Sequence, residues 1–359
     1  MEIAMTDGRM AGGRDAERIA WVDTAKGVCI VLVVMMHSTL GVGEAFGREG
    51  FLHHVVAFAK PFRMPDFFLI SGLFLARVID RDWRSYGDKR ILHFVYFYLL
   101  WLVIQSAFRF GQVSGGTVTG FVEHLAWSLV EPYSTLWFVY LLAVFSVVSK
   151  LLRGLPPLAL LAGAACLEIA PIDTPWYLLN EFCERYVYFV AGWLLAPRIF
   201  DLAAAAVRFR GPALAGLAVW AGVNGAFAFS PSPVAGYKTL AELPGLGLVL
   251  GTVGAMAIVS LSALLATTRL AAPFAYAGER SIAVYLAFFL PMAATRTVLL
   301  KTGLIADMGW VSVIVTVAAV LVPLVLERLV NGTRMDVLFR RPAWARIRPI
   351  GRAALQPAE

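Results

Sequence analysis

Long apolar runs separated by short polar stretches are the dominant pattern along this chain. Each run is close to the roughly 20 residues that a helix needs to cross about 30 Å of hydrocarbon. The runs fall near 27–44, 61–79, 91–110, 135–151, 156–172, 182–199, 212–230, 244–266, 281–300 and 310–328. They are continuous and do not alternate apolar with polar residues, as the strands of a membrane barrel do. The pattern therefore predicts an all-α, polytopic integral membrane helix bundle with about ten transmembrane helices.

The composition agrees with a chain that is solvated by lipid. Of the 359 residues, 59% are hydrophobic and 15% are charged, whereas a soluble domain carries about 25% charged residues. The three cysteines, Cys29, Cys166 and Cys183, form no Cys-x-x-Cys pair, and the histidines form no cluster. We therefore expect neither a disulfide framework nor a metal site.

The net charge of +7 is informative through its placement. Lys and Arg accumulate on the cytoplasmic side of membrane helices. With the N-terminus inside, basic residues of the predicted inside segments outnumber those elsewhere by more than two to one. An even number of spans with both termini cytoplasmic fits this bias. The charge thus reflects topology, and we expect the lipid bilayer as a partner and no nucleic acid.

The polar ends of the chain frame one predicted membrane domain. Residues 1–20 are polar and charged, without an apolar core and cleavage site, so we expect a cytoplasmic tail and no removable signal peptide. Residues 21–330 form the membrane domain. Residues 331–359 form a basic cytoplasmic tail, in which Trp344 among several arginines favours contact with anionic lipid of the inner leaflet.

His37 is the strongest single candidate for chemistry. It follows an apolar helix, and an ionisable ring inside a hydrophobic span is costly and usually functional. A neutral imidazole can take a proton from a hydroxyl group as that group attacks a carbonyl carbon. The alternative is a satisfied packing histidine. Lys26 lies eleven residues earlier, about 16 Å away along a helix that rises about 1.5 Å per residue, and so stands near one membrane face.

A second candidate cluster opens the predicted span 61–79 from the outer side. Arg63 and Asp66 are three residues apart and share a helical face, where they can pair. Ser71 and Gly72 are small enough to let a neighbouring helix or an extended ligand approach closely. Because this span returns antiparallel to the first, we expect Arg63 and Asp66 within a few turns of His37. The alternative is a helix start with a surface ion pair and a packing glycine.

Two further clusters have both a structural and a functional interpretation. Arg84, Lys89 and Arg90 lie in a basic loop on the predicted inner side. Their charge either only follows the usual excess of basic residues on that side or binds the phosphates of a coenzyme A thioester. Trp137 and Tyr140 stand at a predicted membrane boundary, where such residues usually anchor the helix. The preceding Ser-Thr pair at positions 134 and 135 can also line a path for a sugar.

In their order along the chain, these residues resemble the acyltransferase 3 family of integral-membrane acyltransferases, particularly its fucose 4-O-acetylase-like branch. The matching elements are Asp23-x-x-Lys26-Gly27, His37 eleven residues after Lys26, Met64-Pro65-x-Phe67-Phe68-x-x-Ser71-Gly72, Lys89-Arg90, Leu136-Trp137-Phe138 and Gly278-x-x-Ser281-x-x-x-Tyr285. Three positions depart from the family pattern. Phe288 and Arg63 stand where relatives often have His, and His93 stands where many have a second Arg.

The resemblance implies a ten-helix enzyme of a bacterial-type inner membrane, with several passes through it. Such an enzyme transfers an acyl group, commonly acetyl from acetyl-CoA, to a hydroxyl of a cell-envelope or exported glycan, or of a lipid-linked sugar. His37 would be the essential histidine, Lys26 its basic partner and Asp23 a further residue of the catalytic motif. Direct transfer and a covalent acyl relay both remain open.

Our interpretation is an acetyl-CoA-dependent O-acyltransferase for polysaccharide modification. The donor phosphates would bind Arg84, Lys89 and Arg90. The acceptor would approach from the side that holds Arg63, Asp66, Ser71, Trp137 and Tyr140, with Arg63 or Ser71 stabilising the oxyanion. The alternative is a transporter or permease for a lipid-linked sugar or small metabolite, although the sequence lacks the repeated halves that many transporters show.

Overall fold

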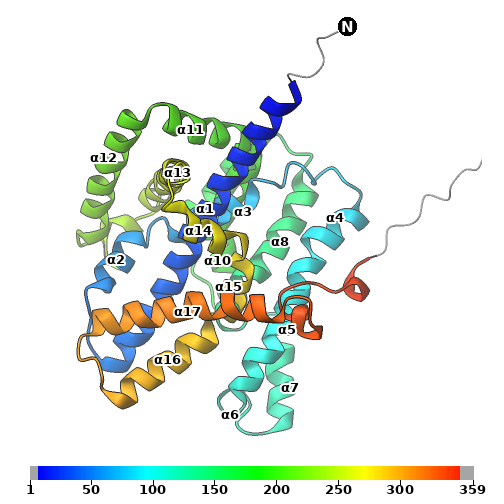
Figure 1. The fold of residues 1–359 in the computed structure, drawn as a ribbon, viewed down its shortest axis with the longest axis vertical. Helices are drawn as coiled ribbons and strands as arrows, with labels where there is room; N and C mark the ends of the chain where they lie inside the picture. The colour runs from blue at the N-terminus through cyan, green and yellow to red at the C-terminus, as the bar shows by residue number, and fades with distance from the viewer. Residues whose placement is uncertain (1–6, 348–359) are drawn as a thin grey trace, which may run out of the picture. The chain divides into compact units, whose positions relative to one another are not determined.

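The structure is a computed structural model that describes residues 7–347, with side chains described from residue 20, and it consists of helices joined by short loops (Figure 1). The described residues contain no strand and only one isolated antiparallel bridge, between Pro231 and Thr239. By their contacts they form two compact units. The first unit comprises Met1–Ala76 and Gly154–Asn331, and the second comprises Arg77–Arg153 and Gly332–Glu359. The ends of the predicted terminal tails, 1–6 and 348–359, lie outside the described residues.

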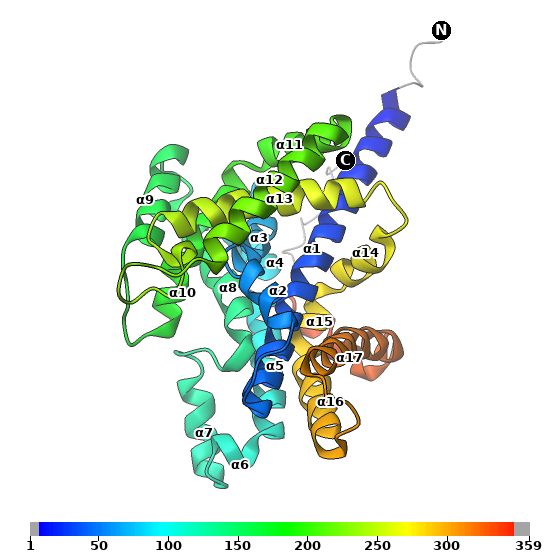
Figure 2. The same ribbon diagram turned by 90° about the vertical axis from the view of Figure 1, so that its left-hand side faces the viewer.

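The first unit contains most of the long helices. Its elements are α1 Asp7–Phe46, α2 Leu52–Ala59, α3 Arg63–Gly72, α9 Pro157–Ile169, α10 Tyr177–Leu194, α11 Ala196–Arg208, α12 Arg210–Phe229, the 3₁₀ turn η2 Leu240–Glu242, α13 Leu246–Leu265, α14 Ala271–Glu279, α15 Ser281–Ala287, α16 Phe289–Thr302 and α17 Met308–Val330. The helix α1 packs along α14, α17, α13 and α3. The neighbouring courses of α1 and α14 can be followed in Figures 1 and 2.

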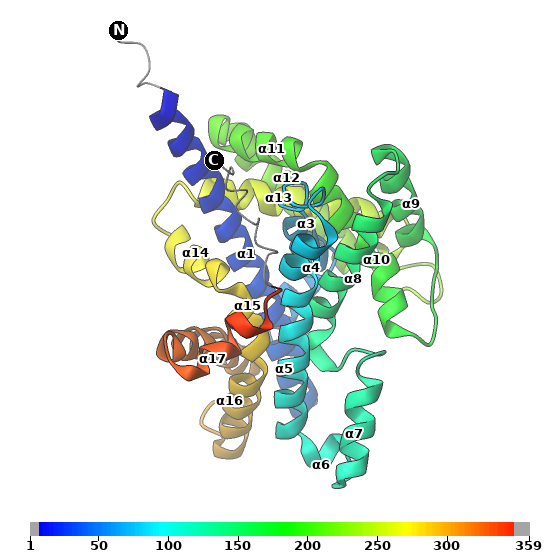
Figure 3. The ribbon, with the colours of Figure 1, turned by 90° about the vertical axis from the view of Figure 1, so that its right-hand side faces the viewer.

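The second unit is smaller. Its elements are α4 Trp83–Arg90, α5 Leu92–Phe108, α6 Phe110–Val113, α7 Val118–Trp127, η1 Ser134–Leu136, α8 Trp137–Leu152, η3 Arg334–Leu338 and η4 Ala343–Ala345. The helix α5 packs on α8, and Figure 3 shows α4 leading into α5.

The chain is a polytopic helical membrane protein, as its apolar runs predict. Within the described residues, six helical segments are long and apolar enough to cross a membrane, and two bent helix pairs raise the number to eight. The six are Ala20–Phe46, Trp83–Phe108, Ser134–Leu152, Arg210–Phe229, Leu246–Leu265 and Met308–Val330. Two of the ten predicted runs instead form short helices, because α3 has 10 residues and α9 has 13.

Proline explains why the two remaining runs bend. The pair α10 and α11 bends by 77°, and Pro197 lies in the first turn of α11. The pair α15 and α16 bends by 52° at Phe288, with Pro291 three residues later. Proline has no N–H to bond the carbonyl four residues before it, so a helix tends to break or kink there. The second bend lies beside His37, the candidate base.

Glycines let the central helices of the first unit touch through their backbones. A Cβ on Gly72 of α3 would collide with the carbonyl of Phe189, and one on Gly192 of α10 would collide with the carbonyl of Leu69. Each glycine thus faces the other helix, and the small-residue contact expected at Gly72 is confirmed. This contact fixes the position of α3, which carries Arg63 and Asp66.

Replacing Gly72 with Leu should therefore lower the thermal stability of the detergent-solubilised protein. Overpacking of this kind costs about 1–3 kcal/mol, because two backbones must separate to admit the side chain. The matched control is Gly222→Leu on α12, where a Cβ would meet no atom within 4 Å. Melting followed by size-exclusion chromatography measures the difference. Equal melting temperatures for the two variants would contradict this packing.

The described part of the predicted C-terminal tail packs on the second unit. Arg341 is 7% exposed and forms an ion pair of 2.7 Å with Asp88 of α4. Two side chains of α5 hold the same segment, since the Tyr96 hydroxyl donates to the Val337 carbonyl at 2.8 Å and Trp101 Nε1 donates to the Leu338 carbonyl at 2.9 Å. Arg341 is thus bound to protein, whereas Trp344 is 80% exposed, so contact of this tail with anionic lipid stays a prediction.

Candidate functional site

His37 lies in the first unit, on the face of α1 that meets the bent pair α15 and α16. Its ring is tilted by 33° against the ring of Phe288, with centroids 5.4 Å apart. Phe288 is fully buried and is the residue at which the two helices bend. Within the described residues neither nitrogen of His37 forms a hydrogen bond. The imidazole is therefore half-buried against protein, with both nitrogens available to a substrate.

Arg63 begins α3 and is the charged residue whose field acts on His37. Its Nε and Nη1 atoms are buried and find no hydrogen-bond partner in the described part of the chain. A buried unpaired charge costs several kcal/mol, so proteins normally pair or hydrate it. An oxygen atom of a bound substrate is the kind of partner that this guanidinium lacks.

Asp66, one turn further along α3, is also buried without a partner. It is 0% exposed, and neither carboxylate oxygen accepts a hydrogen bond from any described residue. The ion pair that the sequence suggests between Arg63 and Asp66 does not form among these residues, so that expectation is wrong. The two charges act on each other, but Asp66 is turned towards Cys29 of α1 and Arg63 towards Arg185 and Glu181, so no contact short enough for an ion pair forms.

Ser71 lies near the C-terminal end of α3. Its hydroxyl donates to the Phe67 carbonyl at 2.8 Å, within its own helix. A hydroxyl that is committed in this way is a poorer oxyanion donor than a guanidinium with free N–H groups. Of the two candidates that the sequence offers, the geometry favours Arg63.

Asp23 and Lys26 lie at the other end of α1 and pair with each other at 3.0 Å. Both are on the same continuous helix as His37, so about 16 Å of helix separates Lys26 from the imidazole. This end of α1 packs on α14, where a Cβ on Gly278 would collide with the Asp23 carbonyl. The structure therefore does not bring Asp23 and Lys26 to His37, and their catalytic role stays a prediction.

The predicted donor-binding residues belong to the second unit. All three lie on α4, where Arg84 and Lys89 are exposed and Arg90 is half-buried. Asp82 caps this helix by accepting a hydrogen bond of 2.8 Å from the Ser85 N–H. The short helix thus presents two free cations on one exposed segment, an arrangement that suits phosphate groups. Binding of coenzyme A here stays a prediction.

Trp137 and Tyr140, on the first turn of α8, are half-buried in the second unit. The Tyr140 hydroxyl donates to the Leu129 carbonyl at 2.9 Å, and its ring lies 5.1 Å from that of Tyr98. The Trp137 ring packs edge-on against Phe138. These contacts anchor the start of α8, which favours the structural interpretation of Tyr140 over a contact with sugar.

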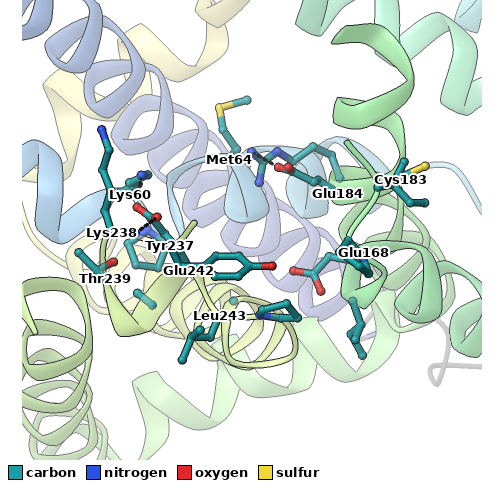
Figure 4. Close-up of a pocket in the computed structure, with 18 of the residues that line it drawn as sticks. Lys60, Met64, Glu168, Cys183, Glu184, Tyr237, Lys238, Thr239, Glu242 and Leu243 are labelled. Carbon is teal, nitrogen blue, oxygen red and sulfur yellow. Dashed lines mark hydrogen bonds and ion pairs between the residues drawn. The ribbon is translucent and has the colours of Figure 1, made fainter. Parts of the chain in front are cut away.

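A cavity of about 800 Å³ lies within the first unit, at the ends of several helices. It is enclosed by the start of α3, the end of α9, the start of α10 and the segment that joins α12 to α13. Figure 4 shows Lys60, Lys238 and Glu242 on one wall and Glu168 and Glu184 on the opposite wall. Arg63 lines the same cavity. The candidate oxyanion donor is therefore also part of a large polar pocket.

Ion pairs hold both walls of this pocket. On one wall the Lys60 ammonium pairs with Glu242, whose other oxygen accepts a hydrogen bond of 2.8 Å from the Lys238 N–H. Burial alone would raise the pKa of Glu242, but these hydrogen bonds outweigh it and hold that pKa below its usual value. On the opposite wall Arg185 pairs with Glu184 at 2.8 Å and with Glu181 at 3.2 Å. Glu181 and Arg185 are four residues apart on α10 and thus form an ion pair along one face of that helix.

One carboxylate on the pocket wall has spare hydrogen-bonding capacity. The Tyr188 hydroxyl donates to Glu168 Oε1 at 3.4 Å, whereas Glu168 Oε2 is buried with no partner among the described residues. Sequence analysis did not identify Glu168, Lys238 or Glu242 as functional. All three lie in or beside segments that the distribution of basic residues predicts to face outside. This shared side was the one hint in the sequence that these residues, far apart along the chain, lie together. In the described residues, no three His, Cys, Asp or Glu side chains are placed to hold a metal ion.

Comparisons of this chain with known proteins indicate which family it resembles. A family model described as an acyltransferase domain matches residues 19–328. The inner membrane protein YcfT of Escherichia coli (strain K12) is 25% identical over 197 residues, which are 48% of this chain and 55% of YcfT. The chain thus matches about half the length of that curated relative. No solved structure matches the chain.

Proposed function

Because the chain belongs to the acyltransferase 3 family, whose model spans residues 19–328, we propose that it is a membrane-bound O-acyltransferase. The proposed reaction moves an acyl group, most simply acetyl from acetyl-CoA, to a hydroxyl of a cell-envelope or exported glycan. The observation that carries this proposal is His37, whose nitrogens are free of hydrogen bonds among the described residues, next to the unpartnered guanidinium of Arg63. A base and an oxyanion donor are the two groups that acyl transfer to an alcohol requires.

In the proposed mechanism His37 acts as the general base. It takes the proton of the acceptor hydroxyl while the hydroxyl oxygen forms a bond to the thioester carbonyl carbon. The negative charge that develops on the carbonyl oxygen is stabilised by N–H groups of Arg63. When the carbon–sulfur bond breaks, the thiolate of coenzyme A leaves and receives the proton from His37. The ester and the free thiol are the products, and no metal or redox partner is needed.

The donor is proposed to bind through its phosphates to Arg84, Lys89 and Arg90. The charge distribution predicts that α4 starts from the cytoplasmic side, where acyl-CoA is available.

The name of YcfT and the several apolar helices support an inner-membrane location with multiple passes. Family membership favours the acyltransferase over the alternative of a transporter, and no observation on the described residues favours the latter.

The purified protein in detergent should release free coenzyme A from acetyl-CoA when an acceptor glycan is added, and more slowly without it, when water takes the place of the acceptor hydroxyl. Release is measured with a thiol reagent, and labelled acetyl groups reveal any transfer product. A transporter would leave acetyl-CoA intact. Protein that is folded and monodisperse but consumes no acetyl-CoA, and whose gene makes no difference to the acylation of envelope glycans, would contradict the proposed function.

A further inference from the structure

The pocket of about 800 Å³ in the first unit has a position that suits the acceptor. The helix ends around it belong to segments that the distribution of basic residues predicts to be outside, namely the loops after α2, α9 and α12. Its volume lies within the range of about 300–1,000 Å³ that is typical of small-molecule sites. A glycan outside the membrane would therefore find this pocket accessible from its own side.

Arg63 connects the pocket to the candidate base. The residue lines the pocket wall, and its charge also acts on His37. Two of its N–H-bearing atoms are buried and unpartnered among the described residues. A molecule in the pocket can therefore reach the guanidinium, whereas His37 lies outside the lining and is related to the pocket through the charge of Arg63 and the packing of α3 on α1.

The charges of the pocket wall indicate which kind of acceptor fits. Basic and acidic side chains are equal in number, and the lining includes Lys60, Arg63, Arg185 and Lys238 against Glu168, Asp173, Glu184 and Glu242. The ion pairs Lys60–Glu242 and Arg185–Glu184 neutralise half of them. Arg63 and Lys238 remain as donors, and Glu168 and Asp173 remain as acceptors, none of them in an ion pair with another described residue.

This balance favours a ligand that both donates and accepts hydrogen bonds and carries no net charge. A hydroxyl group does both, whereas a carboxylate or phosphate only accepts: it can bind Arg63 and Lys238, but it is repelled by Glu168 and Asp173 and has no proton to donate to them. Buried polar groups need partners, and the unpartnered Glu168 Oε2 calls for a donor such as a sugar hydroxyl. Tyr188 and Tyr237 add two rings to the wall, in keeping with the mixed apolar and polar lining of ligand sites.

We propose that this pocket holds the acceptor, and that the acceptor is an uncharged sugar residue of the glycan, with one hydroxyl directed past Arg63 to His37. The proposal rests on the proposed acyltransferase function and adds to it a binding site and a substrate class. Glu168 binds a hydroxyl as an acceptor, and Lys238 binds one as a donor. Uronic acids and phosphorylated sugars bind less well, because their anionic groups cannot donate a hydrogen bond to Glu168 or Asp173.

The test uses two pocket variants in cells that lack the chromosomal copy of the gene. Gly247→Phe fills the pocket, because a Cβ there has open space apart from ordinary contacts at 3.5 Å to the Ala241 carbonyl and 3.6 Å to Glu168 Oε1. Glu168→Gln leaves the size of the side chain unchanged and removes the charged acceptor. Gly222→Phe is the matched control, since it places the same ring on an exposed part of α12 with no atom within 4 Å.

Mass spectrometry of the envelope glycans measures O-acetylation and identifies the modified sugar. We expect Gly247→Phe and Glu168→Gln to lower acetylation at least ten-fold and Gly222→Phe to leave it unchanged. The purified pocket variants should keep the wild-type melting temperature in detergent and the wild-type affinity for acetyl-CoA, which separates loss of acceptor binding from loss of fold or of donor binding.

Two results would overturn the proposal while leaving the acyltransferase function intact. One is normal acetylation by both pocket variants when a His37→Ala variant has none. The other is an acetyl group on a uronic acid or a phosphorylated sugar. In contrast, a wild-type protein that neither consumes acetyl-CoA nor changes the glycans would show that the underlying function, and not only the pocket, is wrong.

Discussion

Replacing Arg63 with Met should slow acyl transfer by about 10²–10³-fold, which is the usual loss when one oxyanion donor is removed. The amount of folded protein should not fall, because the Nε and Nη1 atoms of Arg63 have no partner among the described residues that the variant would leave unpaired. Removing a buried charge of this kind is neutral or stabilising. Initial rates of transfer from labelled acetyl-CoA, together with melting temperatures in detergent, measure the two effects.

Two further variants show whether the guanidinium acts on the reaction or only on the fold. Arg63→Lys keeps the positive charge but offers a single ammonium in place of a planar fork, so we expect partial activity. Arg48→Met removes a fully exposed arginine in the loop after α1 and should leave the rate unchanged. If Arg63→Met retained the wild-type rate, another group would have to stabilise the oxyanion.

Much of the fold follows from local sequence pattern. The apolar runs predict the helices because a lipid solvent demands about 20 apolar residues per crossing. The number of full crossings is harder to predict. The runs 61–79 and 156–172 are largely apolar and long enough to cross a membrane, yet they form the 10-residue α3 and the 13-residue α9. Contacts with other helices, such as that between Gly72 and Phe189, determine where α3 ends, and these are not visible in a local pattern.

The candidate site was predictable in part. The polar residue His37 in an apolar run is a strong local signal, and α3, which carries Arg63, packs on α1 as the return of the chain predicts. The predicted pairing of Arg63 with Asp66 fails because spacing gives a shared helical face but not the neighbours of each side chain. The pocket was missed because its walls come from loops far apart in sequence, such as those at Lys60 and Glu242.

The contact between His37 and Phe288 gives a physical meaning to one departure from the family pattern. The sequence has Phe at position 288, where many relatives have His, and the structure places this ring 5.4 Å from that of His37. A phenyl ring, and not a second imidazole, therefore lies against the imidazole of His37 at position 288. Under the proposed mechanism His37 therefore exchanges its proton directly with substrate or solvent.

Replacing His37 with Ala should abolish acyl transfer. A positioned general base contributes about 10²–10⁴-fold to rate, and Phe288 offers no ionisable group that could take its place. The protein should still insert and fold, because His37 forms no hydrogen bond with other described residues and loses only its packing on Phe288. The matched control is His54→Ala on α2, whose exposed ring lies against Phe229 and does not line the pocket.

The decisive measurement is the rate of acetyl transfer by equal amounts of purified, folded wild-type, His37→Ala and His54→Ala protein, at saturating acetyl-CoA. The account predicts loss of at least 99% of the rate for His37→Ala, within the usual range for a general base. His54→Ala should retain the wild-type rate. Undiminished transfer by His37→Ala would show that this imidazole takes no proton from the acceptor and that the reaction occurs elsewhere in the protein.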